Sequence, residues 1–423
     1  MGALTLNNAN AMPAATWHRL RMNDTAVEIP EGLSFSRDAA LEAESGLEGD
    51  PGAFDAAVAN LQAALDARRE GEPADKRAML AAIEDDVDVH DLNIPALSVY
   101  EKRAVAEEVA QNVADAFECG MGADAYAFLN DAAGARTTLV AKAGGARTAT
   151  VRVNGRDGAA NVAAVDVVAE AGADVTLNVA FDSPEAGAGV VGLSLRVFAD
   201  AGARVNVNTI HTLSPSWTAL DDEGYIAADD ARITVSHRVL GAGKSYTGLA
   251  CDLRGDGADA TILTRYLGHG DDTLDFNYVV RHRGKKTTCN LDAQGVLADS
   301  SRKVLRGTID LVHGCKGSVG SERETVLLAD ENVDNKTIPI ILCDEDDVAG
   351  NHGATIGHVR PEQLNYLMTR GISQEAAERL FANATLEEAA ITAPDATVRA
   401  SVARLARELG VPFELVGEKE GEE

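Results

Sequence analysis

Three cysteines recur at a spacing that would bring their thiols close together in a repetitive fold. Cys289, Cys315 and Cys343 are 26 and 28 residues apart. Free cysteine is among the most buried residue types, so a stacked ladder of small core side chains is one interpretation. The other interpretation is sulfur or iron handling, for which Cys315 and Cys343 are candidate metal ligands. His313 stands two residues before Cys315, which predicts that both lie on one face of a strand.

The cysteine inventory limits the other kinds of site. The chain has five cysteines, an odd number, and none of them forms a Cys-x-x-Cys pair. This argues against a disulfide framework and against an autonomous zinc or ferredoxin-type site. We therefore expect free thiols in a reducing compartment.

A Gly-Lys-Ser sequence at residues 243–245 resembles the end of a phosphate-binding loop. The complete motif needs a glycine at the position occupied by Arg238, and a helix must follow so that its amino terminus meets the phosphate. Here strand-like sequence follows Tyr246. We predict a plain turn and no nucleotide bound by this chain.

The acidic run Asp344-Glu345-Asp346-Asp347 has two interpretations. Polysaccharide-active enzymes built on parallel β-helices use acidic ligands for calcium and a nearby arginine or lysine as base, which makes such an enzyme an alternative function. The run lacks the alternating ligand spacing of a dedicated calcium loop. Solvated turn charges are the simpler explanation.

Composition excludes some partners. The 423 residues carry a formal net charge of -29, which leaves no basic stripe for phosphates, so we expect no nucleic-acid or membrane partner. No apolar run approaches the roughly 20 residues that span a bilayer, and the amino terminus lacks the pattern of an export signal. We expect a cytoplasmic protein.

A repeat dominates the middle of the chain. Short alternating runs begin after Gly-Ala or Asp-Ala turns, whose alanines stand at positions 146, 173, 203, 231 and 258. A turn and a strand that recur every 27 to 30 residues are typical of a β-solenoid, in which each coil stacks its apolar face on the next. An antiparallel sandwich with similar turns remains the alternative.

Helical periodicity flanks this repeat, which suggests three regions. We expect a mostly helical region over 1–135, a β-helix core over 136–358 and a helical region with an acidic tail over 359–423. The predicted helices are Ala53 to Glu70, Ala74 to Glu84, Lys102 to Phe117, Pro361 to Gly371, Ser373 to Ala382, Leu386 to Ile391 and Ala396 to Leu409.

A series of motifs between residues 281 and 372 resembles the SufB/SufD family of iron–sulfur cluster assembly proteins. The motifs are Arg281-His282-Arg283-Gly284, Gly295 to Asp299, Leu305 to Ile309, Thr337-Ile338-Pro339, Asp346-Asp347-Val348, His352 to Gly357 and Leu364 to Ile372. They occur in the order and at the spacing of the family. Trp17 to Leu20 resembles, more weakly, the amino-terminal region of SufD-like chains.

The resemblance implies a right-handed parallel β-helix between helical ends and a scaffold without turnover of its own. It also implies partners: SufD pairs with SufB, each binds one SufC ATPase through carboxy-terminal helices, and a transient iron–sulfur cluster forms at the SufB–SufD interface. The residues of this chain that would dock SufC are Leu364, Tyr366, Leu367, Arg370 and Gly371.

The resemblance also assigns a candidate cluster ligand and favours SufD over SufB. His352 matches the histidine that SufD is thought to contribute to the cluster site. Gly353 follows it where SufB has a glutamate, and residues 322–324 contain no cysteine where SufB carries its essential one. Gly350-Asn351 also stands where SufD has a cysteine or small residue. These departures leave open a self-sufficient homodimer with SufC.

Overall fold

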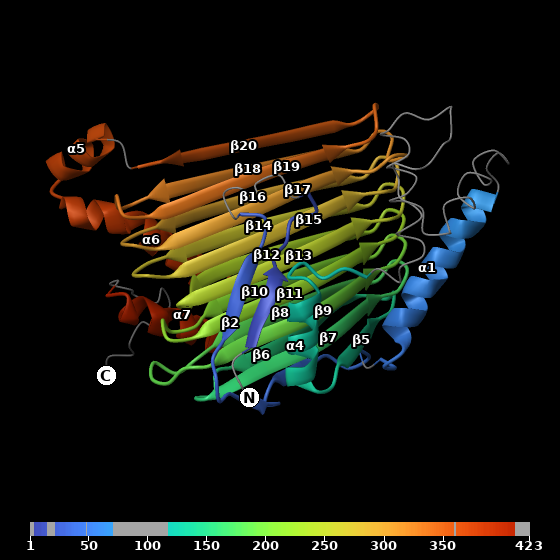
Figure 1. The fold of residues 1–423 in the computed structure, drawn as a ribbon, viewed down its shortest axis with the longest axis horizontal. Coiled ribbons are helices and arrows are strands. Elements are labelled where there is room, and N and C mark those ends of the chain that lie inside the picture. Colours follow the sequence, from blue (N-terminus) through green and yellow to red (C-terminus); the bar gives the residue numbers. More distant parts are fainter. Residues whose placement is uncertain (1–3, 15–21, 48, 71–116, 359–360, 411–423) are drawn as a thin grey trace, which may run out of the picture.

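The computed structural model describes residues 4–14, 22–47, 49–70, 117–358 and 361–410. Two nine-stranded sheets face each other and wind into a β-solenoid (Figure 1). Neighbouring strands from β6 and β7 onward are parallel in both sheets. The predicted mainly β solenoid is therefore confirmed, and the antiparallel sandwich is wrong.

The strands alternate between the two sheets along the chain. The first sheet contains β4 (Ala40–Ala43), β6 (Ala146–Asn154), β8 (Asp174–Asp182), β10 (Arg204–Thr212), β12 (Arg232–Gly241), β14 (Asp259–Gly268), β16 (Thr288–Leu297), β18 (Val319–Leu328) and β20 (Ala349–Gly357). The second contains β3 (Ser34–Ser36), β7 (Ala159–Ala169), β9 (Val190–Ala199), β11 (Thr218–Ala227), β13 (Lys244–Leu253), β15 (Thr273–His282), β17 (Arg302–Leu311) and β19 (Asp334–Cys343), with β5 (Thr137–Ala141) beside β7.

The repeated alanines set the register of the coils. Ala173, Ala203 and Ala231 each precede a strand, and the carbonyl of each accepts a hydrogen bond from the backbone amide that opens the strand of the next coil, at 2.8 to 2.9 Å. The first repeat is offset by one residue, because Ala146 pairs with Asp174 rather than with Ala173. The turns therefore stack in line and keep the strands parallel.

Alternate residues of each strand fill the solenoid interior. On β8, Val175 and Leu177 are buried and pair with Val205 and Val207 of β10 in the next coil. Each such side chain contributes roughly 1.5–3 kcal/mol when it leaves water. A single coil would leave one side of this row exposed, so the coils stabilise one another.

The amino-terminal region differs from the prediction. Helix α1 (Ala53–Glu70) forms as expected, whereas the predicted helices at 74–84 and 102–117 lie, except for Phe117, outside the described residues. Four strands were not predicted, including β1 (Leu4–Ala9) and β2 (Thr25–Ile29), which pair antiparallel. The signal was present in the alternating Thr-Ala-Val-Glu-Ile of β2, whose Val27 and Ile29 are buried.

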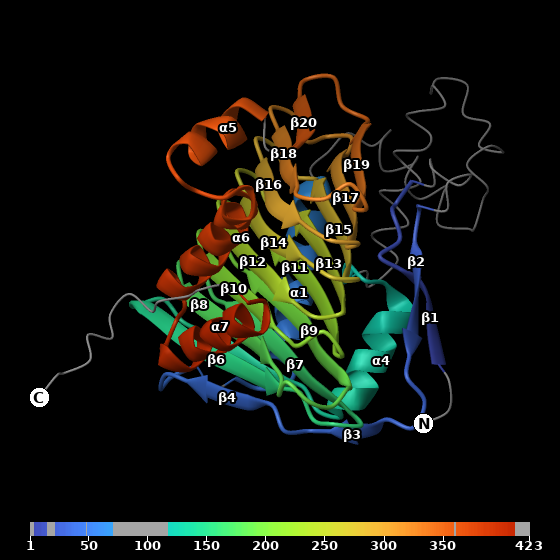
Figure 2. The same cartoon turned by 90° about the vertical axis from the view of Figure 1, so that its left-hand side faces the viewer.

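Helices cover the outer faces of both sheets (Figure 2). Helix α1 and helix α4 (Ala123–Ala133) pack on the second sheet, α1 through Phe54 and α4 through Phe128 and Leu129. Helices α6 (Gln374–Ile391) and α7 (Ala396–Glu408) pack on the first sheet. Among the described residues, no helix is long and apolar enough to cross a membrane.

The carboxy-terminal helices agree with the prediction except at one break. Helix α5 (Pro361–Thr369) ends before Gly371, whose φ of 86° suits a glycine after a helix. Helix α6 is continuous where we predicted two helices, because the intervening Asn-Ala-Thr contains neither glycine nor proline. Helix α7 begins after Asp395, whose carboxylate accepts hydrogen bonds from the amides of Thr397 and Val398.

The two ends of the solenoid differ. Strands β3 and β4 cover its first coil, whereas no strand of the described chain pairs with the outer edge of β19 or β20. The backbone amide of Asp334, the first residue of β19, and that of Asp344, the residue after the strand, both point toward β17. Because successive backbone nitrogens of a strand point to opposite edges, the nitrogen of Pro339 points toward the free edge. No neighbouring strand pairs there, so the missing N–H of proline costs no hydrogen bond between strands.

Candidate functional site

His352 lies on β20, in the uncovered last coil. It pairs in register with Glu322 of β18, which in turn pairs with Leu291 of β16. Parallel partners in register share a face, and Leu291 and Glu322 are buried in the interior. The His352 side chain therefore continues an interior row, but it is exposed because no further coil covers it.

Glu322 provides an unusual carboxyl group beneath this histidine. Among the described residues, its Oε2 atom has no hydrogen-bond partner, although the side chain is only 6% exposed. Its pKa is raised to about 8, mainly by burial and also by the neighbouring Glu324, while Lys303 opposes the shift. Gly307 makes the room, because a Cβ there would lie 2.1 Å from Oε1 of Glu322. The last coil thus places the exposed His352 imidazole next to the row position of Glu322, a carboxyl group that is protonated at neutral pH.

A buried ion pair lies beside Glu322 in the interior. Lys303 of β17 contacts the Glu324 carboxylate, and both side chains are at most 1% exposed. The hydroxyl groups of Tyr266 and Thr337 donate hydrogen bonds to the same carboxylate. Sequence reasoning missed these residues. The available signal was Lys303 at an inward position of β17, whose other inward residues are apolar, and two glutamates, Glu322 and Glu324, at inward positions of β18.

The candidate thiols occupy successive coils, as their spacing predicted, but they differ in exposure. Cys289 is buried at the start of β16, Cys315 is fully buried in the turn before β18, and Cys343 is exposed at the end of β19. Burial raises the pKa of Cys315 to about 12, so it is a protonated core residue at neutral pH. Only Cys343 shares the last coil with His352.

The predicted pairing of His313 with Cys315 on one strand face is wrong. Strand β17 ends at Leu311, and the segment that follows is a turn in which Gly314 has a φ of 102°. The turn directs His313 outward, with its Nδ1 3.4 Å from the carbonyl oxygen of Asp344. The same turn directs Cys315 inward.

The two loop motifs form plain turns. The Gly-Lys-Ser segment joins β12 to β13, and Lys244 opens a strand rather than a helix, as predicted. In the acidic run, the Glu345 carboxylate accepts hydrogen bonds from the backbone amides of Gly314 and Asp346. The only group of potential metal ligands within the described residues lies elsewhere, in the solenoid interior.

The family-like Arg-His-Arg-Gly motif holds coils together. His282 faces the interior, whereas Arg281 forms an outer ion pair with Asp310 and Arg283 forms one with Asp252. At Gly284, a Cβ would lie 1.9 Å from a backbone oxygen of the preceding coil. The motif is therefore explained by packing and by charge pairing between coils.

The segment predicted to dock a partner exposes an apolar surface. On α5, Tyr366 is 58% exposed and Met368 is 48% exposed, and the Arg370 guanidinium lies 5.0 Å from the centre of the Tyr366 ring. Leu367 is half-buried, and Gly371 ends the helix. The side chain of Leu364 lies outside the described residues.

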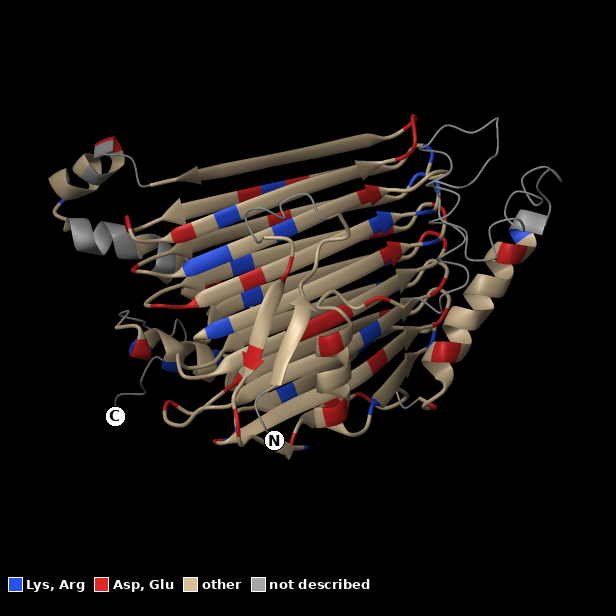
Figure 3. Ribbon diagram, viewed as in Figure 1, with Lys and Arg blue, Asp and Glu red and all other residues tan. Residues whose placement is uncertain are grey.

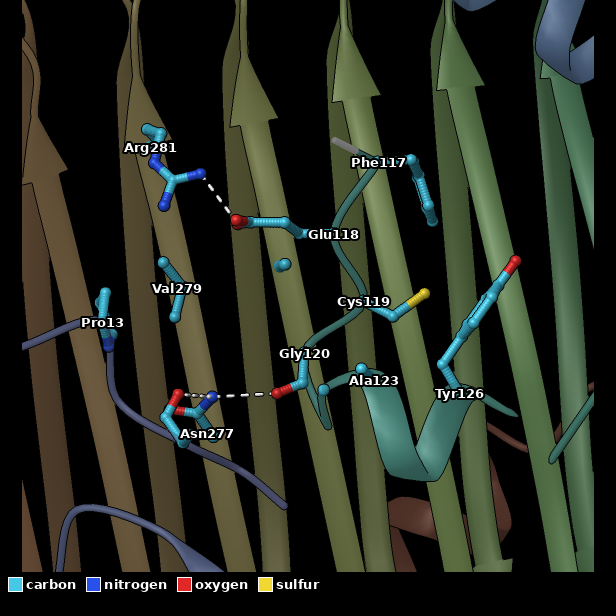
Figure 4. A pocket seen from close by; sticks show the side chains of 13 residues that line it. Pro13, Phe117, Glu118, Cys119, Gly120, Ala123, Tyr126, Asn277, Val279 and Arg281 are labelled. Atoms are coloured by element: carbon cyan, nitrogen blue, oxygen red, sulfur yellow. Dashed lines mark hydrogen bonds and ion pairs between the residues drawn. The ribbon is translucent and has the colours of Figure 1, made fainter. Parts of the chain in front are cut away.

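A pocket of about 420 Å³ lies between the amino-terminal segment and the outer face of the second sheet (Figure 4). Cys119 lines it, and the Glu118–Arg281 ion pair at 2.8 Å borders it. Burial raises the pKa of the Cys119 thiol well above its usual range, and nearby Asp222 raises it further. The thiol is therefore protonated and is not a ready nucleophile.

Comparison with known proteins identifies the family of this chain. A sequence model described as the SUF system FeS cluster assembly SufBD core domain matches residues 151–385, more than half of the chain. The chain belongs to the SufBD core family. The resemblance seen in the sequence motifs is thereby confirmed, and the match extends from β6 into α6.

Three curated relatives of this SufBD family member are named as iron–sulfur cluster assembly proteins. The assembly protein SufD of Bacillus subtilis is 32% identical over 179 residues, which are 42% of this chain and 41% of that protein. SufBD family proteins of Mycobacterium tuberculosis and Staphylococcus saprophyticus are 28% and 27% identical, over 34% and 32% of this chain and 17% and 30% of their own lengths. The alignments thus cover less than half of each relative.

Proposed function

We propose that this chain is a non-catalytic scaffold subunit of a Suf system, which pairs with a SufB-like chain, docks the SufC ATPase and holds a nascent iron–sulfur cluster. The observation that carries the proposal is the uncovered last coil, where His352 continues an interior row into solvent. A cluster is cargo here and needs an accessible ligand at a surface that a second subunit can complete.

The His352 imidazole supplies a nitrogen ligand, which suits iron beside a thiolate from the partner or from Cys343. The free edge of β20, which contains no proline, supplies the surface for the partner. Helix α5, with its exposed Tyr366, supplies a surface for SufC. The proposed division into three regions, 1–135, 136–358 and 359–423, follows these roles.

We expect His352→Ala to lower the iron bound after anaerobic reconstitution with iron and sulfide. The protein is purified with SufC, with and without a SufB partner, and cluster is measured by visible absorbance and iron content. The matched control is His358→Ala, since His358 is also exposed and lies just beyond β20. Equal loss in both variants would argue against a ligand role for His352.

The same experiment separates the possible assemblies. Cluster that appears only with SufB supports the heterodimer. Cluster formed by this chain with SufC alone supports the homodimeric scaffold. Absence of any association with SufC would overturn the assignment.

Tyr366→Ala should weaken binding to SufC while leaving the fold intact. An exposed aromatic side chain that anchors an interface contributes about 2 kcal/mol or more, which is a loss of about thirtyfold in affinity. Calorimetric titration measures the change, and the thermal midpoint of the free chain should not move. Arg407→Ala, on the exposed side of α7, is the matched control. Unchanged affinity in Tyr366→Ala would exclude α5 as the docking helix.

A further inference from the structure

A group of ionisable side chains lies inside the solenoid, far in sequence from the last coil. Asp221 and Glu223 of β11 face the interior and are fully buried. In the preceding coil their register partners are Leu193 and Leu195. Two carboxyl groups thus interrupt an aliphatic row. Figure 3 shows that charged residues occur within the strands as well as in the turns.

Two histidines of the facing sheet complete the group. The Nε2 atom of His237, on β12, lies 3.1 Å from Oε2 of Glu223. The Nε2 atom of His211, on β10, lies 3.2 Å from Oδ2 of Asp221. Both imidazoles are at most 1% exposed. The four side chains therefore meet with their ligating atoms inward, in a space closed to solvent.

This arrangement is costly without a compensating charge. Moving an ionised carboxylate into a protein interior costs several kcal/mol, and two neighbouring carboxylates also repel each other. The Oδ1 atom of Asp221 has no hydrogen-bond partner in the part of the chain that the structure describes. Hydrogen bonds within the group therefore do not satisfy all of its acceptors, and an additional cation would.

We propose that Asp221, Glu223 and His237 bind one divalent transition-metal ion inside the solenoid. One ligand atom from each of the three residues lies within 4.8 Å of the other two. Two ligand atoms about 2.1 Å from an ion and at right angles to each other are about 3 Å apart. The His237–Glu223 separation of 3.1 Å fits such a pair. Two carboxylates also balance the charge of a divalent ion.

Surrounding hydroxyl groups hold the ligands in place, as the outer partners of a metal site do. The Nδ1 atom of His237 lies 3.3 Å from the Tyr278 hydroxyl, which leaves Nε2 to face the carboxylates. The Tyr225 hydroxyl donates to Glu223 at 2.6 Å. His211 is a positioning residue for Asp221, and its Nδ1 lies 3.4 Å from the Ser245 hydroxyl.

The ligand set indicates the class of metal. It offers oxygen and imidazole nitrogen but no thiolate, which suits Zn²⁺, Fe²⁺ or Mn²⁺ rather than Cu⁺ or an iron–sulfur cluster. Because the side chains are buried, the ion would enter as the chain folds and would exchange slowly afterwards. The site is separate from His352 and does not depend on a role in cluster assembly.

The test uses the whole chain, which is unfolded in denaturant with a chelator present to remove any metal. It is then refolded with Zn²⁺, with Co²⁺ or with chelator alone. After gel filtration we expect one ion per chain and a higher thermal midpoint in the metal samples. The Co²⁺ protein should show ligand-field bands without thiolate charge transfer. Metal-refolded protein that holds no more ion than the chelator sample would overturn the proposal, and this comparison needs no variant.

Variants then locate the ion. His237→Gln and Glu223→Gln should lose it, whereas His282→Leu removes a buried imidazole elsewhere in the interior and should keep it. Retention of a full ion in His237→Gln would place the metal elsewhere and overturn the proposal. Thiolate charge-transfer bands in the Co²⁺ protein would also overturn it.

Discussion

Replacing Lys303 by methionine is expected to lower the free energy of unfolding by about 3 to 5 kcal/mol. The substitution keeps the aliphatic stem but removes the charge that faces Glu324, and both side chains are at most 1% exposed. Glu324 would then be a buried anion without its cation, or would have to take up a proton. Urea denaturation at neutral pH, monitored by circular dichroism, measures the change.

Two further variants show whether the loss comes from the unpaired charge. Lys303→Met combined with Glu324→Gln removes both charges and keeps an acceptor for the Tyr266 hydroxyl, so it should recover most of the stability. Lys336→Met breaks an exposed pair with Asp334 and should cost less than about 1 kcal/mol. If Lys303→Met unfolds at the same urea concentration as the unaltered protein, the pair does not stabilise the interior.

Acid should destabilise the protein through His282. Burial lowers the pKa of this histidine from 6.5 to about 4. Above pH 6.5 the imidazole is neutral in both states and has no effect. As the pH falls from 6.5 to about 4, the unfolded chain takes up a proton that the folded chain does not, so the free energy of unfolding decreases. A shift of this size corresponds to about 3 kcal/mol.

His282→Leu isolates this contribution. In register, His282 lies between Leu253 and Leu311, so a leucine continues an aliphatic row. The Thr287 hydroxyl, which contacts the imidazole, keeps its contact with the Ser318 hydroxyl. Urea midpoints of the two proteins should lie close together near pH 7 and diverge toward about pH 4.5, with the variant more stable. Parallel pH curves for the two proteins would contradict the prediction.

The solenoid could be predicted from the sequence because its periodicity is local. The turn alanines recur at a nearly constant interval, and each turn closes its own coil, so the signal does not depend on distant contacts. The carboxy-terminal helices also show their signals locally, such as Gly371 after α5 and Asp395 before α7. The family motifs added His352, which periodicity alone did not distinguish.

The interior groups could not be predicted because they depend on which residues of the two facing sheets meet across the interior. Asp221 and His237 belong to different sheets, and their proximity follows from the path of the whole coil rather than from any local pattern. The hypothesis for His313 and Cys315 failed for a related reason. It assumed that β17 continues beyond Leu311, whereas a turn rich in glycine begins there.

Pro339 has a consequence for how copies of this protein can associate. The unpaired edge strands at an uncovered solenoid end can pair with the end of another copy, and repeated end-on pairing would give fibres. The nitrogen of Pro339 points to the free edge of β19 and cannot donate, so a further coil would meet an interrupted ladder there. The neighbouring edge of β20 contains no proline. One end of the molecule can therefore accept a partner strand on β20 alone, which favours a closed pair of subunits over an open polymer.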